Sequence, residues 1–186
     1  VLSAQTVLLD EGFENGKGSW IFSTVSGGND FLIKLDKGYN SSYGLRCGTI
    51  GTPNFAISPA VTFTANQPYK ISFMAYAGRT NSRKVEVFYN STAALNGAET
   101  LIGTIEEVPA TYTAFTLNLT NPPAGVKYII FRGVIKGTNN TWTDLVFDDI
   151  KVVQTINFIP TANITQPVHN ATHTAGQPLT VTVDAS

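Results

Sequence analysis

The chain of 186 residues has little charge, one cysteine, two histidines and no long apolar run. Charged residues make up only 13%, and 12 basic against 13 acidic side chains leave a formal charge of −1. Binding to nucleic acid needs clustered Lys and Arg in excess, so this balance argues against nucleic acid as a partner. No stretch approaches the roughly 18 apolar residues of a membrane-spanning helix. With 42% hydrophobic residues, the chain can nevertheless bury a core.

The single cysteine, Cys47, excludes an internal disulfide and a cysteine-built metal site. It lies in a strand-like stretch, so we expect a buried thiol that packs as a small hydrophobic side chain. Residues 1–4 resemble the end of a signal peptide, with small residues just before Gln5. The 24 Thr and 15 Asn are typical of a β-rich, extracellular protein with a polar but uncharged surface. We therefore expect a secreted or cell-surface protein.

Motifs of catalysis are missing as well. The two histidines, His169 and His173, stand in His-Asn-Ala-Thr-His, which has the spacing of a zinc-binding motif but lacks its glutamate base. No nucleophile elbow, phosphate loop or dinucleotide fingerprint occurs. Glu106 and Glu107 are adjacent and would face opposite sides of a strand. We predict no enzyme in this segment; a sandwich-fold polysaccharide hydrolase, the least favoured alternative, would need two carboxylates about 5–9.5 Å apart in a cleft.

Period-two alternation of apolar and polar residues replaces the missing helical pattern. In 69–76, for example, Ile71, Phe73 and Ala75 share one face, whereas 126–135 is apolar on both faces, as expected of a central strand. Turn-forming residues separate such segments and give an all-β, jelly-roll β-sandwich over residues 5–154. Strands are predicted at 7–14, 31–35, 43–50, 55–57, 61–64, 69–76, 84–89, 101–104, 113–119, 126–135 and 145–153.

The character of the sequence changes after Val153, where the last predicted strand of the sandwich ends. Residues 155–161 read as a linker, and 162–167 and 179–184 read as two further strands. These strands resemble the start of an immunoglobulin-like module over 162–186, which would be incomplete because such a module needs about 100 residues. We therefore expect neighbouring domains in the same polypeptide.

Two acidic motifs lie near the ends of the sandwich segment: one at residues 10–14, and Asp148-Asp149 in its last strand. If the terminal strands pair, these carboxylates meet. Alternation places Asp148 on the same face as Ile150, hence inward, where a carboxylate needs a partner or a metal ion. Ca²⁺ takes six to eight oxygens from carboxylates and carbonyls. The candidate ligands are Glu14, Asp148, Asp149 and the main chain around Gly12 and Asn40. The alternative is that the two aspartates only solvate a strand end or pair with lysine.

The two acidic motifs are part of a resemblance to known protein families. The segment GFENGKGSW (12–20), together with the terminal FDDIKV (147–152), resembles the sandwich shared by family 4 and family 22 carbohydrate-binding modules and MAM domains. It is most similar to the cleaved-adhesin or choice-of-anchor J modules of secreted Bacteroidetes proteins, over residues 7–153. The resemblance implies a jelly roll with calcium bound by Glu14 and Asp148. MAM domains carry disulfides, which this chain cannot form.

Sugar-binding sandwiches carry aromatic side chains on the outer face of one sheet or on rim loops. Here outward aromatics and their polar neighbours are expected on strands that would lie side by side, and Trp142 stands in a polar loop. The candidate ligand-binding residues are Trp142, Tyr76, Phe88, Tyr128, Arg132 and Glu86. The alternative for each is ordinary packing under a loop. We therefore predict a non-catalytic module that binds a polysaccharide, glycan or cell-surface component; the alternative is a protein–protein adhesion or spacer module without a sugar site.

Overall fold

The computed structural model describes residues 5–22, 31–48, 54–136, 143–155, 162–166, 172, 174–176 and 181–185. These residues contain no helix, and so none that is long and apolar enough to cross a membrane. The chain divides into two compact units, Val1–Ile156 and Asn157–Ser186. The strands are β1 (Thr6–Glu11), β2 (Ile21–Phe22), β3 (Leu32–Leu35), β4 (Tyr43–Cys47), β5 (Asn54–Ile57), β6 (Val61–Phe63), β7 (Tyr69–Ala77), β8 (Arg83–Asn90), β9 (Thr100–Ile105), β10 (Thr113–Leu119), β11 (Gly125–Ile135), β12 (Leu145–Gln154), β13 (Ala162–Gln166) and β14 (Thr182–Ala185).

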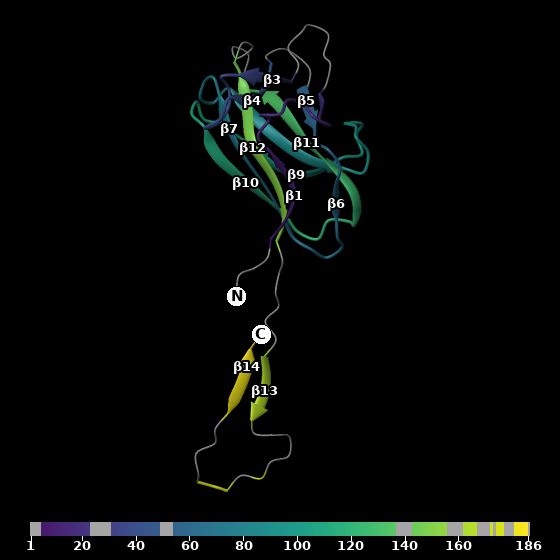
Figure 1. The fold of residues 1–186 in the computed structure, drawn as a ribbon, viewed down its shortest axis with the longest axis vertical. Coiled ribbons are helices and arrows are strands. Elements are labelled where there is room, and N and C mark those ends of the chain that lie inside the picture. The colour runs from purple at the N-terminus through teal and green to yellow at the C-terminus, as the bar shows by residue number, and fades with distance from the viewer. Residues whose placement is uncertain are drawn as a thin grey trace. The chain divides into compact units, whose positions relative to one another are not determined.

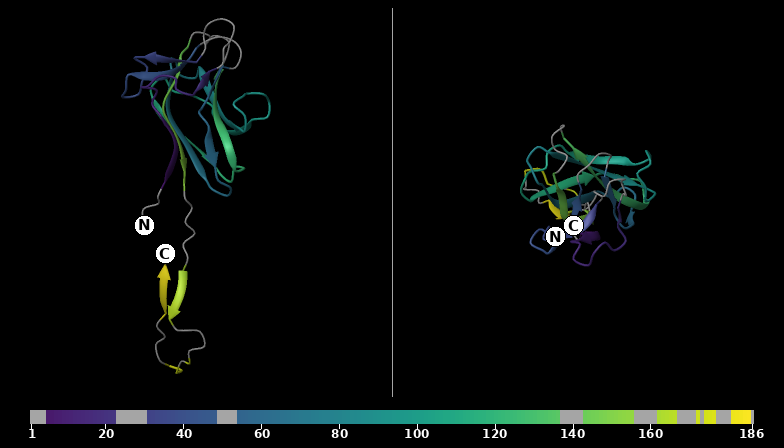
Figure 2. Two further views of the ribbon diagram at one scale, coloured as in Figure 1. Left: turned by 45° about the vertical axis from the view of Figure 1, so that its right-hand side comes forward. Right: turned by 90° about the horizontal axis from the view of Figure 1, so that it is seen from above.

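The first unit is a sandwich of two antiparallel sheets, which face each other in Figures 1 and 2. The first sheet has the order β10-β7-β12-β4-β3, and β1 pairs with β12. The second sheet has the order β2-β5-β11-β8-β9, and β6 pairs with β11. Most neighbouring strands are not consecutive in the chain, so the two sheets are interwoven rather than formed by separate halves. The all-β sandwich predicted from the sequence is confirmed.

Alternation along the strands decides which side chains reach the core. In β7, every second residue is buried, and Ile71, Phe73 and Ala75 lie in the core as predicted. The predicted segments match the observed strands closely, except for the two-residue β2, which the sequence analysis missed. Two residues are too few to show a period, so no pattern could have revealed this strand.

Strand β11 is central in the second sheet, between β5 and β8, as its two apolar faces predicted. Ile129 and Phe131 point into the core between the sheets. Ile130 points outward and forms a second, smaller apolar cluster with Ile57 and Phe88. The outer face of the second sheet is thus partly apolar and covered.

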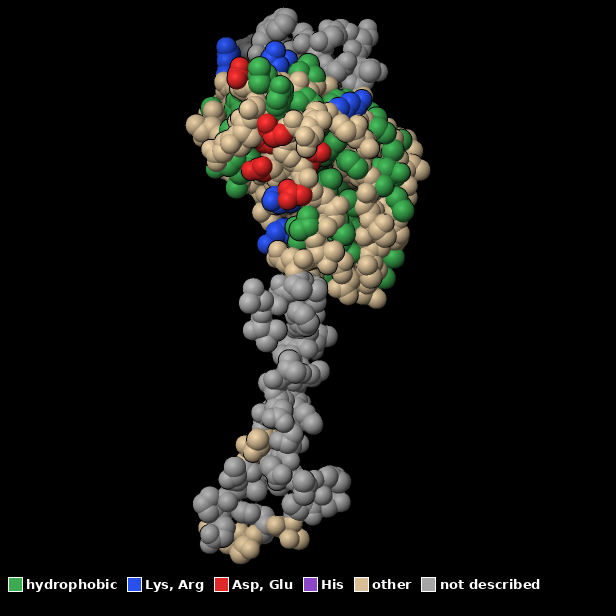
Figure 3. All heavy atoms as spheres, viewed as in Figure 1, with side chains coloured by type: hydrophobic (Ala, Val, Ile, Leu, Met, Phe, Trp, Pro, Cys, Tyr) green, Lys and Arg blue, Asp and Glu red, His purple; other side chains and the backbone are tan. Residues whose placement is uncertain are grey.

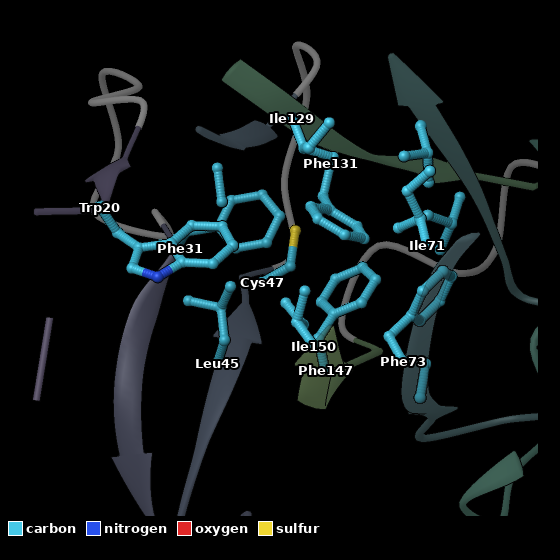
Figure 4. Close-up of a cluster of buried hydrophobic side chains, with 14 of the residues drawn as sticks. Trp20, Phe31, Leu45, Cys47, Ile71, Phe73, Ile129, Phe131, Phe147 and Ile150 are labelled. Atoms are coloured by element: carbon cyan, nitrogen blue, oxygen red, sulfur yellow. The ribbon is translucent and has the colours of Figure 1, made fainter. Parts of the chain in front are cut away.

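Aromatic rings fill the centre of the core (Figure 4). The ring of Phe131 lies 5.3 Å from that of Phe73 and 5.6 Å from that of Phe147, both edge-on. The Trp20 ring lies 6.2 Å from that of Phe131 and is buried in the same core. Cys47 lies among these rings, and burial raises the pKa of its thiol to about 12. It is therefore a protonated packing residue at neutral pH, as predicted.

The second unit contains β13 and β14, which pair antiparallel with Ala162 opposite Ala185. They form a two-stranded sheet of their own. Both strands overlap the segments 162–167 and 179–184, which the sequence analysis predicted as strands. The immunoglobulin-like character of this unit stays a prediction.

Candidate functional site

The pairing of β1 with β12 brings the two acidic motifs together. Glu11 stands opposite Ile150, and Asp10 stands opposite Lys151, whose Nζ lies 3.1 Å from the Asp10 Oδ2. Figure 3 shows acidic side chains gathered on this face, over β1 and β12. The first and last strands of the sandwich therefore lie side by side, as the sequence analysis assumed.

A β-bulge in β12 changes the direction in which Asp148 points. The register with β7 shifts between Asp148 and Lys151, and Asp149 has a positive φ of 47°. Because of this bulge, Phe147 and Ile150 both lie in the core, whereas Asp148 stands opposite Met74 and points to the outer face. The prediction that Asp148 shares the inward face of Ile150 was wrong, since it assumed unbroken alternation.

Asp148 is nevertheless fully buried, because the 36–42 loop between β3 and β4 covers it. Its Oδ2 accepts hydrogen bonds from the Tyr39 amide (2.6 Å) and the Ser41 hydroxyl (2.9 Å), and its Oδ1 accepts one from the Asp149 amide (2.8 Å). Burial and the charge of Asp149 raise the pKa of Asp148 despite these bonds. A cation placed beside the ionised Asp148 carboxylate would therefore stabilise it.

The other predicted metal ligands surround the same place. A Cβ built on Gly12 would lie 3.8 Å from Oδ1 of both Asp148 and Asp149, so the two carboxylates flank the Gly12 main chain. Glu14 Oε1 accepts hydrogen bonds from the Ser42 amide (3.1 Å) and the Tyr43 amide (2.7 Å) and so fixes the end of the 36–42 loop.

Asn40 belongs to this loop and has a positive φ of 53°. Within the described ranges, no three His, Cys, Asp or Glu side chains come close enough to form a metal cluster. Two aspartates and main-chain oxygens are the donors that remain for an ion.

Glu11, which the sequence analysis did not single out, organises the start of this region. Its Oε1 accepts a hydrogen bond from the Phe13 amide (2.7 Å), and its Oε2 accepts one from Trp20 Nε1 (3.2 Å). Phe13 has a positive φ of 59° and is fully buried, with its ring 5.4 Å from the Trp20 ring. Glu11 thus holds the tight turn that aims Glu14 at the 36–42 loop.

Three tyrosines gather next to Asp148 on the outer face of the first sheet. Tyr76 projects from β7, and its ring lies 4.7 Å from that of Tyr112, which in turn lies 5.3 Å from that of Tyr39. The Tyr112 hydroxyl donates a hydrogen bond to the Lys37 carbonyl, while burial and the charge of Asp148 raise the pKa of Tyr112. The sequence analysis named only Tyr76, since the other two lie in loops without periodicity.

Two adjoining cavities open beside these rings, and Lys37 and Tyr76 line both of them. The larger has a volume of about 330 Å³, and the smaller one of about 190 Å³. We call the two together the tyrosine pocket. Besides the shared pair, the larger is lined by Asp36, Gly38, Ala110, Thr111 and Tyr112, and the smaller by Gly78, Arg79, Thr143 and Asp144.

Ion pairs fix the floor of the smaller cavity. Asp144 Oδ1 lies 2.7 Å from Arg46 Nη2 and accepts a hydrogen bond from Arg46 Nε, and its Oδ2 lies 3.3 Å from Lys37 Nζ. Burial opposes the charge of Asp144, but Arg46 and Lys37 outweigh it and hold the pKa of this carboxyl below its ordinary value. A hydrogen bond with Tyr76, together with Asp144, raises the pKa of Lys37. Asp144 and Lys37 are therefore held in their charged forms and in fixed positions by these contacts.

The remaining predicted sugar-binding residues lie on the opposite side of the molecule. Glu86 and Phe88 belong to β8 and Tyr128 and Arg132 to β11, so all four are on the second sheet, whereas Tyr76 is on the first. The expectation that their strands lie side by side with β7 was wrong, because alternation predicts the face of a strand but not its sheet. Trp142 lies outside the described residues.

These four residues mostly bind one another. Glu86 forms an ion pair with Arg132 and a second one with Lys84, at 2.9 Å, and the Arg132 guanidinium lies 5.0 Å from the centre of the Phe88 ring. Burial opposes the charge of Glu86, but Lys84 and Arg132 lower its pKa overall. Phe88 is only 8% exposed, in the apolar cluster that also contacts Tyr128.

Comparison with known proteins finds structural relatives only. No family model and no curated protein sequence matches the chain. The K3 cleaved adhesin domain of Lys-gingipain from Porphyromonas gingivalis W83 is 22% identical, with a TM-score of 0.62 over 81% of this chain and 99% of that one. The CBM22-1 xylan-binding domain of Xyn10C from Paenibacillus barcinonensis is 14% identical, with a TM-score of 0.58 over 85% and 100%.

A third structure holds CBM22-1 and GH10 modules of endo-1,4-β-D-xylanase 10B from Clostridium thermocellum, complexed with xylohexaose. It is 16% identical, with a TM-score of 0.56 over 84% of this chain and 30% of that one. The predicted likeness to cleaved-adhesin and family 22 modules is confirmed at the level of the fold, which is what identities this low show.

Proposed function

We propose that this chain is a non-catalytic module that binds carbohydrate in the tyrosine pocket. The observation that carries the proposal is an aromatic wall, formed by Tyr76 and Tyr112, beside charged groups at fixed positions in an open cavity. Flat rings stack on the faces of pyranose sugars, while fixed polar groups hydrogen-bond their hydroxyls. Two of the structural neighbours described above are a xylan-binding domain and a pair of CBM22-1 and GH10 modules complexed with xylohexaose, which supports a sugar as the ligand.

The first sheet is the better site for a sugar than the second. On the second sheet, the charged groups of Glu86 and Arg132 are engaged with each other and Phe88 is buried. On the first sheet, Tyr76 is partly exposed and lines both cavities. A ligand can therefore reach the Tyr76 ring without breaking an existing ion pair.

The charges around the pocket favour binding over catalysis. A glycosidase needs a carboxylic acid whose pKa is raised so that it can donate a proton to the leaving oxygen. The carboxyl group that lines the smaller cavity, Asp144, has a lowered pKa because Arg46 and Lys37 hold it ionised. It can accept hydrogen bonds from a sugar but is a poor acid.

The test is retention of the whole chain on insoluble xylan, cellulose and pectin, measured with wild type, Tyr76→Ala and Tyr128→Ala. Truncating an aromatic anchor typically removes more than about 1 kcal/mol of binding energy, so Tyr76→Ala should weaken retention about tenfold. Tyr128→Ala removes the same side chain from the second sheet and should leave retention unchanged. Loss with Tyr128→Ala and not with Tyr76→Ala would move the site to the second sheet and overturn the proposal.

The alternative function is protein–protein adhesion or a spacer without a sugar site. The fold likeness to a cleaved adhesin domain is compatible with it. Failure of the wild type to bind any of the polysaccharides, in calcium-containing buffer, would favour this alternative.

A calcium ion beside Asp148 and an extracellular location complete the proposal. Asp148 and Asp149 would be its charged ligands, with main-chain oxygens near Gly12 and Asn40, while Glu14 holds the loop from which Asn40 comes. The ion would offset the repulsion and burial that raise the pKa of Asp148. Extracellular fluid supplies both calcium and polysaccharide, so we place the module outside the cell and next to other domains of its polypeptide.

A further inference from the structure

The end of the tyrosine pocket beyond Tyr76 holds a cation that no described residue neutralises. Arg79 follows β7, is exposed and lines the smaller cavity. Its carbonyl accepts a hydrogen bond from the Ser82 hydroxyl, but its guanidinium has no hydrogen-bond or ion-pair partner within the described ranges. An Arg side chain presents a planar fork of donors that fits a carboxylate or another oxyanion with two parallel hydrogen bonds.

The charges around this end add up to a local excess of positive charge. Lys37 and Arg79 contribute two positive charges to the lining of the smaller cavity, and Asp144 contributes one negative charge. Asp144 also pairs with Arg46, which lines neither cavity, so the charges of Lys37 and Arg79 remain as the local excess. The one further acidic lining residue, Asp36, belongs to the larger cavity. The protein as a whole carries a net charge of −1, so this positive end is a local feature of the pocket.

We propose that the tyrosine pocket selects glycans bearing an anionic group, a uronate carboxylate or a sulfate ester, and that Arg79 binds that group while the sugar ring lies against Tyr76. This inference rests on the proposed carbohydrate binding and narrows it to a substrate class. Lys37 supports the same selection from the side shared by both cavities. Arg46 pairs with Asp144 and lines neither cavity, so it does not contact the ligand directly and only holds Asp144 in place.

The experiment compares ligands that differ only in charge. Affinity electrophoresis of the whole chain is run in gels containing polygalacturonate or its methyl ester, and dextran sulfate or dextran. The charged member of at least one pair should bind about tenfold more tightly than its neutral partner, and about 0.5 M salt should remove the difference. The pectin pair reports a carboxylate, and the dextran pair reports a sulfate.

Variants then assign the preference to Arg79. Arg79→Gln should lower affinity for the preferred charged ligand about tenfold and leave affinity for its neutral partner unchanged. Lys70→Gln is the matched control, because Lys70 lies on the same strand and face as Tyr76 but about 20 Å along β7. Thermal unfolding of both variants should match wild type, since both side chains are outside the core.

The outcomes separate this inference from the proposed function. Equal affinity for charged and neutral ligands, lost in Tyr76→Ala, would overturn the anionic preference alone. A preference that persists in Arg79→Gln, or disappears equally in Lys70→Gln, would overturn the role of Arg79. Absence of binding to any of these glycans would overturn both proposals.

Discussion

Asp144 lies between Lys37 and Arg46, at the centre of the charges that shape the tyrosine pocket. Since its folded-state pKa is lowered, the stabilisation from these ion pairs is complete above the ordinary pKa of 3.8 and is lost as the pH falls below it. Pairs this exposed contribute about 1 kcal/mol or less each. We predict that Asp144→Asn unfolds at lower urea concentration than wild type at pH 7 and that the difference shrinks below about pH 4. A difference that stays constant down to about pH 2.5 would show that Asp144 acts through packing instead.

Residue roles could be predicted from the sequence only where spacing along one strand decides them. Alternation correctly placed Ile71, Phe73 and Ala75 in the core. It failed at Asp148, because a single extra residue in the bulge reverses the faces and leaves no mark in the hydrophobic pattern. Tyr112 and Lys37 were missed for a related reason, since loops without a period give no indication of what they cover.

At the scale of elements, the bulge in β12, the 36–42 loop and the start of the chain meet around Asp148. We call this place the junction. Burial is the main cause that raises the pKa of Asp148, and the charge of Asp149 at the bulge adds to it, so the proposed calcium ion belongs to this junction. We predict that calcium added to EDTA-treated protein raises the melting temperature by about 5–10 °C at a concentration near 100 times its Kd. Asp149→Asn should abolish most of this shift, because asparagine tolerates the left-handed backbone but lacks the charge.

Asp10→Asn is the matched control for this measurement. Asp10 lies in β1 opposite Lys151, close to the junction, and is exposed. Its removal should leave the calcium-induced shift intact. Identical melting curves in EDTA and in calcium would refute calcium binding at this site. The Asp148 hydrogen bonds and the 36–42 loop do not depend on this outcome.

Elements were predictable where they were long and amphipathic, but their neighbours were not. Both β7 and β8 show the expected outward positions, yet β7 pairs with β10 and β12, while β8 pairs with β9 and β11. Pairing over long sequence separations depends on how complementary whole strand faces are, which a period of two does not encode. The predicted sugar-binding residues were consequently divided between two sheets.

At the scale of the whole molecule, the sandwich is closed by its own first and last strands. Thr6 stands opposite Gln154 and Glu11 opposite Ile150, so the pairing spans the full length of β1. This closure places the start of the sandwich and its exit toward the second unit on adjacent strands. The core, the junction at Asp148 and the tyrosine pocket all consist of residues from the first unit.

We therefore predict that the chain ending at Ile156 keeps the melting temperature and the polysaccharide retention of the whole chain. The second unit supplies none of the described core residues, so its removal takes no apolar burial from the sandwich. Removing residues 1–11 is the contrasting variant. It deletes β1 and exposes the edge of β12, with Leu8 and Leu9 lost from the core margin, and should lower the melting temperature by about 10 °C or prevent folding. Equal destabilisation by the two truncations would mean that the sandwich depends on the second unit for its stability.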